Sequence, residues 1–447
     1  MSSAAKHSTY PSITHSTSAN VACNDRAIDG NATPTIVASS VTSDVTDAMT
    51  SRIIRLRMDE FYPVAVFFPM TSNTAPPAAI GMSLEDVETP ALILDLDAFE
   101  YNVARMASFA ASGRMRLRPH AKTHKCAEIA LQQMSRGAVG VCCQKVSEAE
   151  ALVQGGVTDV LVSNEVVDPR KLSRLAALTD RATIGICVDN VAAVDVLNDA
   201  VNAAGCATPL AVLVEIDVGG DRCGVDPGAP ALLIADRIAS AANLRFRGLQ
   251  AYHGRAQHFR TVAERERAIG HATTAVRHTV DVLQAHGLPC EVVTGGGTGT
   301  YPLETASGVY TELQAGSYIF MDADYRANRS PAGGEFDDFR QSLFVYTQVM
   351  STPGRGYVVV DAGLKSVSVD SGMPVVDGVP GIAYCRPSDE HGMLDVRAAP
   401  TTYRLGDKLK LIPGHCDPTV NLYEWYVAVR GGRVEALWPI VARGATR

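Results

Sequence analysis

The sequence has no pair of cysteines in Cys-x-x-Cys spacing and no pattern typical of a disulfide framework. Its ten cysteines are scattered, at positions 23, 126, 142, 143, 187, 206, 223, 290, 385 and 416. This usage is typical of a reducing compartment, so we predict a cytoplasmic protein. No apolar run approaches the ~20 residues that a membrane-spanning helix needs, and we therefore predict no membrane partner.

An excess of positive charge is also missing. The 447 residues carry a formal net charge of -8. Proteins that bind nucleic acid or anionic membranes favour a basic face, so we predict neither partner. The length allows two domains or one large domain with an appendage, and a hydrophobic content of 46% is sufficient for a sizeable core.

The first 82 residues lack periodicity and are rich in Ser, Thr, Ala and Asn. The apolar run at 64–68 is too short, and lies too far along the chain, for a secretory signal. We predict that 1–82 is a disordered or loosely attached extension, with Met70 or Met82 as alternative translation starts. A transit peptide is disfavoured because basic residues are sparse at the start.

From residue 83 apolar runs alternate regularly with helical stretches. Residues 91–96 are predicted to form a strand and 98–111 a helix. Eight further strands, each followed by a helix or a short link, are predicted to end near Lys122, Gln144, Asn164, Asp189, Gly219, Tyr252, Thr294 and Tyr318. Eight such units predict an α/β fold with a closed (β/α)8 barrel over 83–336. An open doubly wound sheet is the alternative, but no Gly-x-Gly-x-x-Gly follows the first strand.

Beyond residue 336 the predicted strands follow one another without helices. Residues 342–350 and 356–361 are rich in Val, Tyr and Phe, and 425–430 and 434–440 flank Gly431-Gly432-Arg433. Two strands around such glycines predict a hairpin. We therefore predict a C-terminal all-β domain over 337–447.

Lys122 lies where a predicted strand passes to a predicted helix. Arg118 and Lys125 are expected to crowd it with positive charge, which lowers the affinity of an amine for its proton and makes it a nucleophile toward carbonyl carbons. A solvated basic loop is the commoner explanation of such a segment. In a barrel, however, functional groups gather at the C-terminal ends of the strands, where Lys122 is predicted to lie.

A glycine run at 295–299 follows the seventh predicted strand, and Gly316 and Ser317 lie at the eighth. Consecutive glycine amides can surround an anion, and barrels commonly hold phosphate at this place, although a flexible turn is the alternative. A lysine and a phosphate loop in one barrel mouth predict pyridoxal phosphate. Arg222, in a glycine-rich turn, is a candidate partner for the pyridine nitrogen, although alone it would be a surface arginine.

His415 and Asp417 form a second candidate site. On a strand, residues i and i+2 share a face, so both side chains would point to one ion while Cys416 packs on the other side. Imidazole and carboxylate suit a divalent metal, and we predict Mg2+ or Mn2+, with Zn2+ ranked below them. A turn histidine is the alternative. Glu390 and His391 are weaker candidates for groups that orient these ligands.

These motifs together resemble the alanine-racemase-like, fold-type III pyridoxal-phosphate enzymes. The matching segments, 118–125, 141–148, 295–299 and 415–419, occur in order, and the resemblance extends over about 84–444. Within the family the chain is similar to the branch of the D-threonine and 3-hydroxy-D-aspartate aldolases, with the eukaryotic-type D-serine dehydratases as relatives. Those dehydratases typically have a cysteine where this chain has Asp417.

The resemblance implies a Schiff base on Lys122, a metal on His415 and Asp417, and His258 as the catalytic base. It implies cofactor contacts from Gln144, Arg222, Tyr252, Gly296, Gly297, Thr298, Gly316, Ser317 and Tyr318. It also implies a homodimer.

The function expected from the sequence is a metal-dependent aldolase. It would cleave D-threonine or 3-hydroxy-D-aspartate to glycine and acetaldehyde or glyoxylate. Dehydration of the same substrates to a keto acid and ammonia is one alternative. A non-catalytic pyridoxal-phosphate carrier is another, although a carrier needs no metal site, and a racemase would need a second base opposite Lys122.

Overall fold

The computed structural model describes residues 75–447. Most of the predicted extension over 1–82 lies outside the described residues, but its last part is corrected. The amide of Gly81 donates to the carbonyl of Val434 at 2.8 Å, the amide of Val434 donates to Met82 at 2.9 Å, and Ala78 is buried. Residues 77–82 are therefore attached to the fold.

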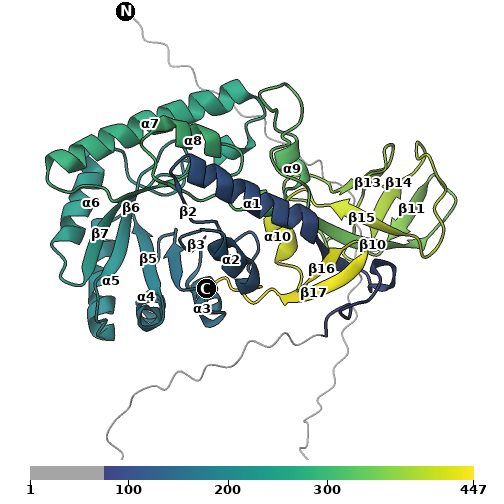
Figure 1. Ribbon diagram of the computed structural model, residues 1–447, viewed down its shortest axis with the longest axis horizontal. Helices are drawn as coiled ribbons and strands as arrows, with labels where there is room; N and C mark the ends of the chain where they lie inside the picture. Colours follow the sequence, from purple (N-terminus) through teal and green to yellow (C-terminus); the bar gives the residue numbers. More distant parts are fainter. Residues whose placement is uncertain (1–74) are drawn as a thin grey trace, which may run out of the picture. The chain divides into compact units, whose positions relative to one another are not determined.

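Eight parallel strands form the predicted barrel (Figure 1). Their order in the sheet is β2 (Arg116–Leu117), β9 (Glu312–Leu313), β8 (Val292–Gly295), β7 (Leu244–Gln250), β6 (Leu210–Glu215), β5 (Thr183–Val188), β4 (Asp159–Val162) and β3 (Val141–Cys143). A parallel bridge between His120 and Cys142 joins the two ends of this order. The predicted α/β barrel is confirmed.

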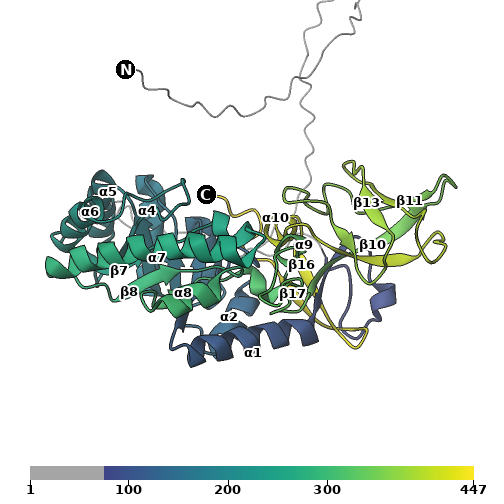
Figure 2. The ribbon, with the colours of Figure 1, turned by 90° about the horizontal axis from the view of Figure 1, so that it is seen from above.

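Helices cover the outside of the barrel, and the longest of them, α7, runs along one side (Figure 2). They are α1 (Leu96–Ser112), α2 (Ala127–Ser135), α3 (Val146–Gln154), α4 (Pro169–Ala176), α5 (Val191–Ala204), α6 (Ala229–Ala239), α7 (Val262–Ala285) and α8 (Tyr301–Ser307). Short 3-10 turns occur at η1 (Leu84–Asp86), η2 (Ala177–Asp180), η3 (Arg255–His258) and η4 (Ser317–Ile319), and a single turn, α9 (Ala323–Arg326), follows η4.

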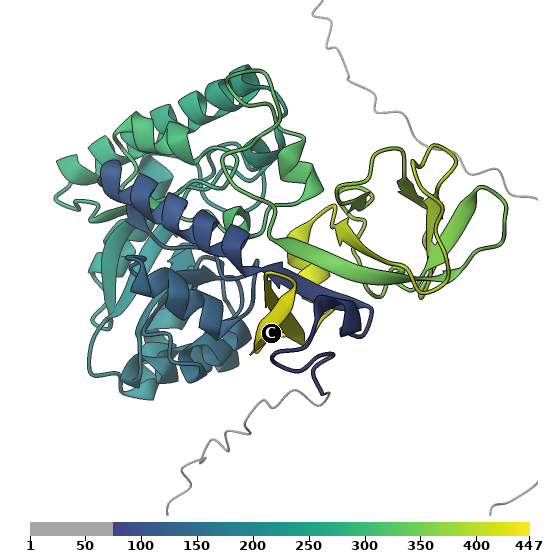
Figure 3. The same ribbon diagram turned by 45° about the vertical axis from the view of Figure 1, so that its right-hand side comes forward.

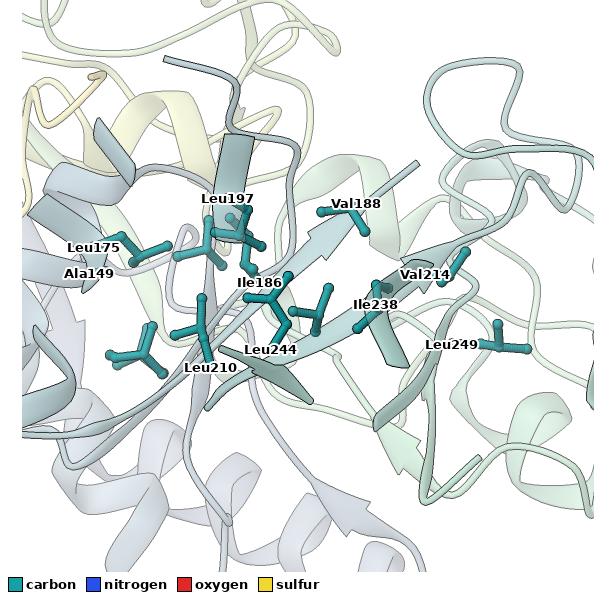
Figure 4. Packing of buried hydrophobic residues seen from close by; sticks show 14 of the residues in the cluster. Ala149, Leu175, Ile186, Val188, Leu197, Leu210, Val214, Ile238, Leu244 and Leu249 are labelled. Atoms are coloured by element: carbon teal, nitrogen blue, oxygen red, sulfur yellow. The ribbon is translucent and has the colours of Figure 1, made fainter. Parts of the chain in front are cut away.

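Successive side chains along a barrel strand point alternately to the outside and the inside, so the barrel core has two layers. Ile186 and Val188 point from β5 toward the helices, where they pack with Leu197 of α5 and Ile238 of α6 (Figure 4). Cys187, between them, belongs to a separate buried cluster inside the barrel. Each large apolar side chain buried in this way contributes about 1.5–3 kcal/mol to folding.

The second sheet has nine strands. Its main path is β13 (Ala383–Cys385), β14 (Gly392–Asp395), β11 (Tyr357–Val360), β10 (Leu343–Ser351), β1 (Ala91–Asp95), β16 (Trp425–Arg430) and β17 (Arg433–Pro439). β15 (Lys408–Ile412) pairs with both β10 and β12 (Val375–Val376), and one short helix, α10 (Cys416–Val420), follows β15.

The position of β1 corrects the predicted boundary between the two sheets. Residues 91–95 were expected to open the barrel segment, but β1 pairs antiparallel with β10 and parallel with β16 (Figure 3). Leu92, Ile93 and Leu94 are almost fully buried on both faces of this strand. Such a strand needs partners on both edges and cover on both faces, which the second sheet supplies.

Within 75–447 no helix is both long enough and apolar enough to cross a membrane.

Candidate active site

Lys122 and Asp417 meet at the mouth of the barrel, although 295 residues separate them in the sequence. The Lys122 Nζ lies 2.8 Å from the Asp417 Oδ2. The charge of Asp417 raises the pKa of Lys122 above its ordinary value. Burial alone would raise the pKa of Asp417, but the charges of Lys122 and His415 hold it well below its usual range. The structure therefore places the lysine beside one of the two predicted metal ligands.

The predicted crowding of Lys122 by cations is wrong. The Arg118 guanidinium lies 2.6 Å from Asp159 and 3.1 Å from Glu312, two carboxylates where β4 and β9 begin, at the opposite end of the barrel. Lys125 forms an ion pair with Glu148. Each neighbouring cation therefore has its own carboxylate, and Asp417 favours the protonated form of Lys122.

His120 and Gln144 form a buried polar group next to Lys122. The Nε2 of Gln144 lies 2.8 Å from the Nε2 of His120 and donates to the carbonyl of Ser163 at 3.1 Å. Burial lowers the pKa of His120 well below its ordinary value, so its imidazole is neutral. The sequence analysis named Gln144 but not His120, although His120 lies within the 118–125 motif, and not Ser163, which lies in a strand-end segment without a motif.

Close backbone approach explains the glycines of the predicted phosphate loop. A Cβ at Gly297 would lie 2.4 Å from the side-chain oxygen of Gln257, and one at Gly316 would lie 2.6 Å from the Thr123 hydroxyl. The loops after β8 and β9 therefore pack directly against η3 and the Lys122 loop. Within the described residues, the buried Thr298 hydroxyl has no hydrogen-bond partner. The loop thus offers a ligand the backbone of Gly296 and the Thr298 hydroxyl, which makes no hydrogen bond within the described residues.

Arg222 and Tyr252 follow β6 and β7 at the same mouth. Burial raises the pKa of the Tyr252 phenol, and the nearby charge of Lys122 opposes this shift. The Nη2 of Arg222 lies 3.8 Å from the carboxyl of Glu215. Burial and the neighbouring Glu165 raise the pKa of Glu215 to about 9, so this carboxyl is neutral at pH 7.

The two residues after Gly316 face the protein interior. The Tyr318 side chain is completely buried, its hydroxyl accepts a hydrogen bond from Gln133 at 3.0 Å, and its ring packs against Phe339. Tyr318 is therefore a core side chain, and only its backbone could contact a cofactor. Ser317 is also buried, at the start of η4.

The His415–Asp417 pair begins a helix, and the prediction that it lies on a strand is wrong. His415 is the extended residue that precedes α10, and Asp417 lies in the first turn of that helix. The two residues are separated by Cys416 alone, at the start of the same helix. Cys416 is completely buried, as predicted for a packing residue, and its amide donates to Asp322 at 3.0 Å.

Asp370 is the carboxylate that orients His415. Its Oδ2 lies 2.8 Å from the Nδ1 of His415. Glu390 and His391, the orienting groups predicted from the sequence, have other partners. Glu390 pairs with Lys365, and the exposed His391 lies beside Ser388. The sequence holds no signal for Asp370, which lies 45 positions before His415.

His258 lies on η3, where its Nδ1 contacts the Oδ2 of Asp324. Its ring is 5.6 Å from that of Tyr325. In the stretch 75–447, no hydrogen bond or ion pair joins His258 directly to Lys122 or to either predicted metal ligand. Its connection to the metal segment runs through α9, which carries Asp324.

Glu165, Asp189 and Cys223 are a further group of potential metal ligands that the sequence analysis missed. Their ligand atoms lie within 4.8 Å of one another. Burial raises the pKa of the Cys223 thiol to about 11, so a metal bound here would have to displace the thiol proton. The metal ligands predicted from the sequence, His415 and Asp417, are not part of this group.

Two protein families match successive parts of the chain. Residues 94–324 match the alanine racemase N-terminal domain, and residues 342–429 match a putative serine dehydratase domain. The first match contains the barrel, and the second lies within the other sheet.

Three relatives cover most of the chain and nearly all of their own length. The 3-hydroxy-D-aspartate aldolase of Paracoccus denitrificans (strain Pd 1222) is 47% identical over 372 residues, which are 82% of this chain and 95% of that protein. The crystal structure of D-threonine aldolase from Filomicrobium marinum matches with a TM-score of 0.80 at 49% identity, covering 84% of this chain and 100% of that chain. The D-threo-3-hydroxyaspartate dehydratase of Delftia sp. (strain HT23) is 30% identical over 80% of this chain and 98% of that protein.

Proposed function

The chain belongs to the alanine racemase N-terminal domain family of pyridoxal-phosphate enzymes, and we propose that it is a metal-dependent aldolase. It cleaves D-β-hydroxy amino acids to glycine and an aldehyde: acetaldehyde from D-threonine, glyoxylate from 3-hydroxy-D-aspartate. The observation that carries this proposal is the 2.8 Å contact between Lys122 and Asp417, which brings the two predicted sites together.

The residues at the barrel mouth fit pyridoxal phosphate. Lys122 offers an amine, the Thr298 hydroxyl is buried and uncommitted, and Gly297 and Gly316 leave no room for a side chain. Lys122 would hold the cofactor's aldehyde carbon, the two loops its phosphate, and Arg222 the ring nitrogen. When bound, the cofactor supplies a ring that stabilises negative charge on the substrate Cα.

Imidazole and carboxylate at the start of α10 fit a divalent metal ion. Because the Nδ1 of His415 is engaged by Asp370, its Nε2 is the nitrogen left for a ligand bond. The lowered pKa of Asp417 keeps its carboxylate ionised and able to bind a cation. Two protein ligands leave coordination positions for water and substrate, which suits Mg2+ or Mn2+ better than a structural Zn2+.

His258 has the residue type required of the base. Aldol cleavage begins when the β-hydroxyl of the substrate loses its proton, and the imidazole Nε2 accepts it. A cation held by His415 and Asp417 would make that proton easier to remove. The Cα–Cβ bond then breaks, the aldehyde leaves, and a proton added at Cα completes glycine.

Dehydration is the second candidate, because residues 342–429 match a putative serine dehydratase domain. Two observations favour cleavage. The two aldolases are 47% and 49% identical to the chain, against 30% for the dehydratase. Asp417 also stands where the resemblance to the dehydratases would place a cysteine.

Product analysis tests the proposal. We expect purified protein given D-threonine or 3-hydroxy-D-aspartate with Mn2+ to release glycine and the matching aldehyde, and EDTA to stop turnover. Lys122→Ala should lose both activity and the visible absorbance of bound cofactor, whereas Lys365→Ala, which changes an exposed lysine, should keep both. Ammonia and a keto acid as main products would contradict cleavage, and full turnover in EDTA would contradict the metal.

A further inference from the structure

Asp324 is a buried carboxylate that the proposed reaction does not use directly. We propose that Asp324 is a positioning residue for His258: it accepts the hydrogen of Nδ1 and thereby leaves Nε2 as the nitrogen that takes the substrate proton. This inference rests on the proposed function of His258 as the base.

Both oxygens of Asp324 are engaged, and only 7% of its side chain is exposed. Oδ2 contacts the Nδ1 of His258, and Oδ1 contacts the Nη2 of Arg260. Arg260 is fixed in turn, because its Nη1 donates to the Asp324 carbonyl at 2.7 Å and to Asn328 at 2.9 Å. The carboxylate therefore has one fixed orientation.

The charge state of Asp324 determines the direction of the hydrogen bond. Burial alone would raise the pKa of Asp324, but the hydrogen bonds from His258 and Arg260 hold it below its ordinary value. An ionised carboxylate only accepts hydrogen bonds, so the hydrogen in this contact belongs to the Nδ1 of His258. The neutral ring then has an unprotonated Nε2, which is the form a general base requires.

The turn that carries Asp324 also holds the segment with the proposed metal ligands. In α9, the amides of Ala323 and Asp324 donate to the carbonyls of Pro413 and Gly414 at 3.0 and 3.3 Å. Asp322, which caps α9, accepts the Cys416 amide at 3.0 Å. One turn of helix thus fixes the ring of His258 relative to His415 and Asp417.

A purely structural ion pair is the alternative, in which Asp324 serves only to neutralise Arg260. That alternative does not explain why one carboxylate oxygen is directed at a histidine rather than at a second donor of Arg260. The two explanations differ in what they predict for the His258 ring, so the test measures the ring directly.

The first measurement is the tautomer of His258 in the holoenzyme with 15N-labelled histidine. We expect the Nδ1-protonated form in the wild type, with the signal identified by its loss in His258→Gln. Asp324→Asn keeps the shape, but its amide can also donate to Nδ1, so the Nε2-protonated form should appear. An Nε2-protonated His258 in the wild type would overturn the inference, whatever the variants do.

The second measurement is a double-mutant cycle on D-threonine cleavage. We expect Asp324→Asn to lower kcat by about 10²-fold or more with little change in KM, which is the usual range for general base catalysis. Because Asp324 acts through His258, adding Asp324→Asn to His258→Gln should cause no further loss. Asp195→Asn, which removes the partner of Arg237 between α5 and α6, is the control and should leave kcat and the tautomer unchanged.

The cycle separates the failure of this inference from the failure of the proposed function. Wild-type kcat in His258→Gln would refute the base itself. A strongly reduced kcat in His258→Gln combined with a silent Asp324→Asn would overturn only the positioning. An additive loss in the double variant would also overturn it, since that is what a structural ion pair predicts.

Discussion

At the scale of residues, each candidate nitrogen side chain of the site contacts a carboxylate. Asp417 lies 2.8 Å from Lys122, Asp370 lies 2.8 Å from His415, and Asp324 contacts His258. For the two histidines, the contact at Nδ1 leaves Nε2 as the ring nitrogen available for chemistry. A histidine that binds a metal through one nitrogen commonly donates its other N–H to such a carboxylate.

Asp370→Asn should therefore weaken the metal site. The amide replaces a charged acceptor with a neutral one and no longer fixes the His415 ring, so we expect Mn2+ affinity to fall about 10–100-fold. Calorimetric titration of the protein with Mn2+ measures this change. Glu390→Gln, which alters an exposed acid paired with Lys365, should bind Mn2+ like the wild type; equal affinities for all three proteins would contradict the role of Asp370.

At the scale of elements, the glycine run depends on a buried acid in the helix after it. Glu304 of α8 is 1% exposed, accepts the Thr300 hydroxyl at 2.7 Å, and lies under Gly296. Burial raises the pKa of Glu304 to about 7. A protonated Glu304 does not repel an anion in the loop above it, so the neutral form of this acid is compatible with a phosphate in the loop.

Glu304→Gln should change how stability depends on pH. The folded protein has a pKa for Glu304 of about 7 against the ordinary 4.5, so the folded state binds the proton more tightly. The free energy of unfolding therefore falls as pH rises from about 4.5 to above 7, by an amount on the order of 3 kcal/mol. Glutamine removes this loss.

Urea unfolding of both proteins at pH 5 and pH 8 tests this expectation. The variant should gain stability relative to the wild type at pH 8, and Glu266→Gln, on the exposed side of α7, should not. A constant difference between Glu304→Gln and the wild type at the two pH values would contradict the buried titration.

At the scale of the whole molecule, the two sheets are not independent folding units, because the chain passes from the second sheet into the barrel and back. β1 lies between β10 and β16, and the chain then passes through α1 into β2 of the barrel. Removing either part exposes the buried residues of the other. We therefore expect one cooperative unfolding transition.

Ile93→Ala tests this coupling from within β1, where Ile93 is 1% exposed. The cavity should cost about 2–5 kcal/mol. The two tryptophans, Trp425 and Trp438, lie in β16 and β17, so fluorescence follows the second sheet while far-UV dichroism follows the barrel helices. The unfolding midpoints measured by the two signals should shift together in Ile93→Ala. Val167→Ala, at a 68% exposed position, should shift neither midpoint. A shift in fluorescence alone would refute the coupling.

Local pattern predicted much of this structure. Alternating apolar runs predicted the barrel strands, and the glycines at 431 and 432 predicted the β16–β17 hairpin, because these features depend on neighbouring residues. Local pattern could not assign β1 to a sheet, since its partners lie more than 240 positions away, at 343–346 and 426–429. It also treated Arg118 and Lys125 as neighbours of Lys122, when each is paired elsewhere.

The sequence by itself determined the fold class and the family, and it predicted the candidate reactive groups: Lys122, the glycine run and the His415–Asp417 pair. Only the tertiary structure decided the protonation of Lys122 and the carboxylates that orient His415 and His258. The physical reason is that a side chain's chemistry depends on charges within a few ångströms, and Asp417, Asp370 and Asp324 lie 295, 45 and 66 positions from the groups they control.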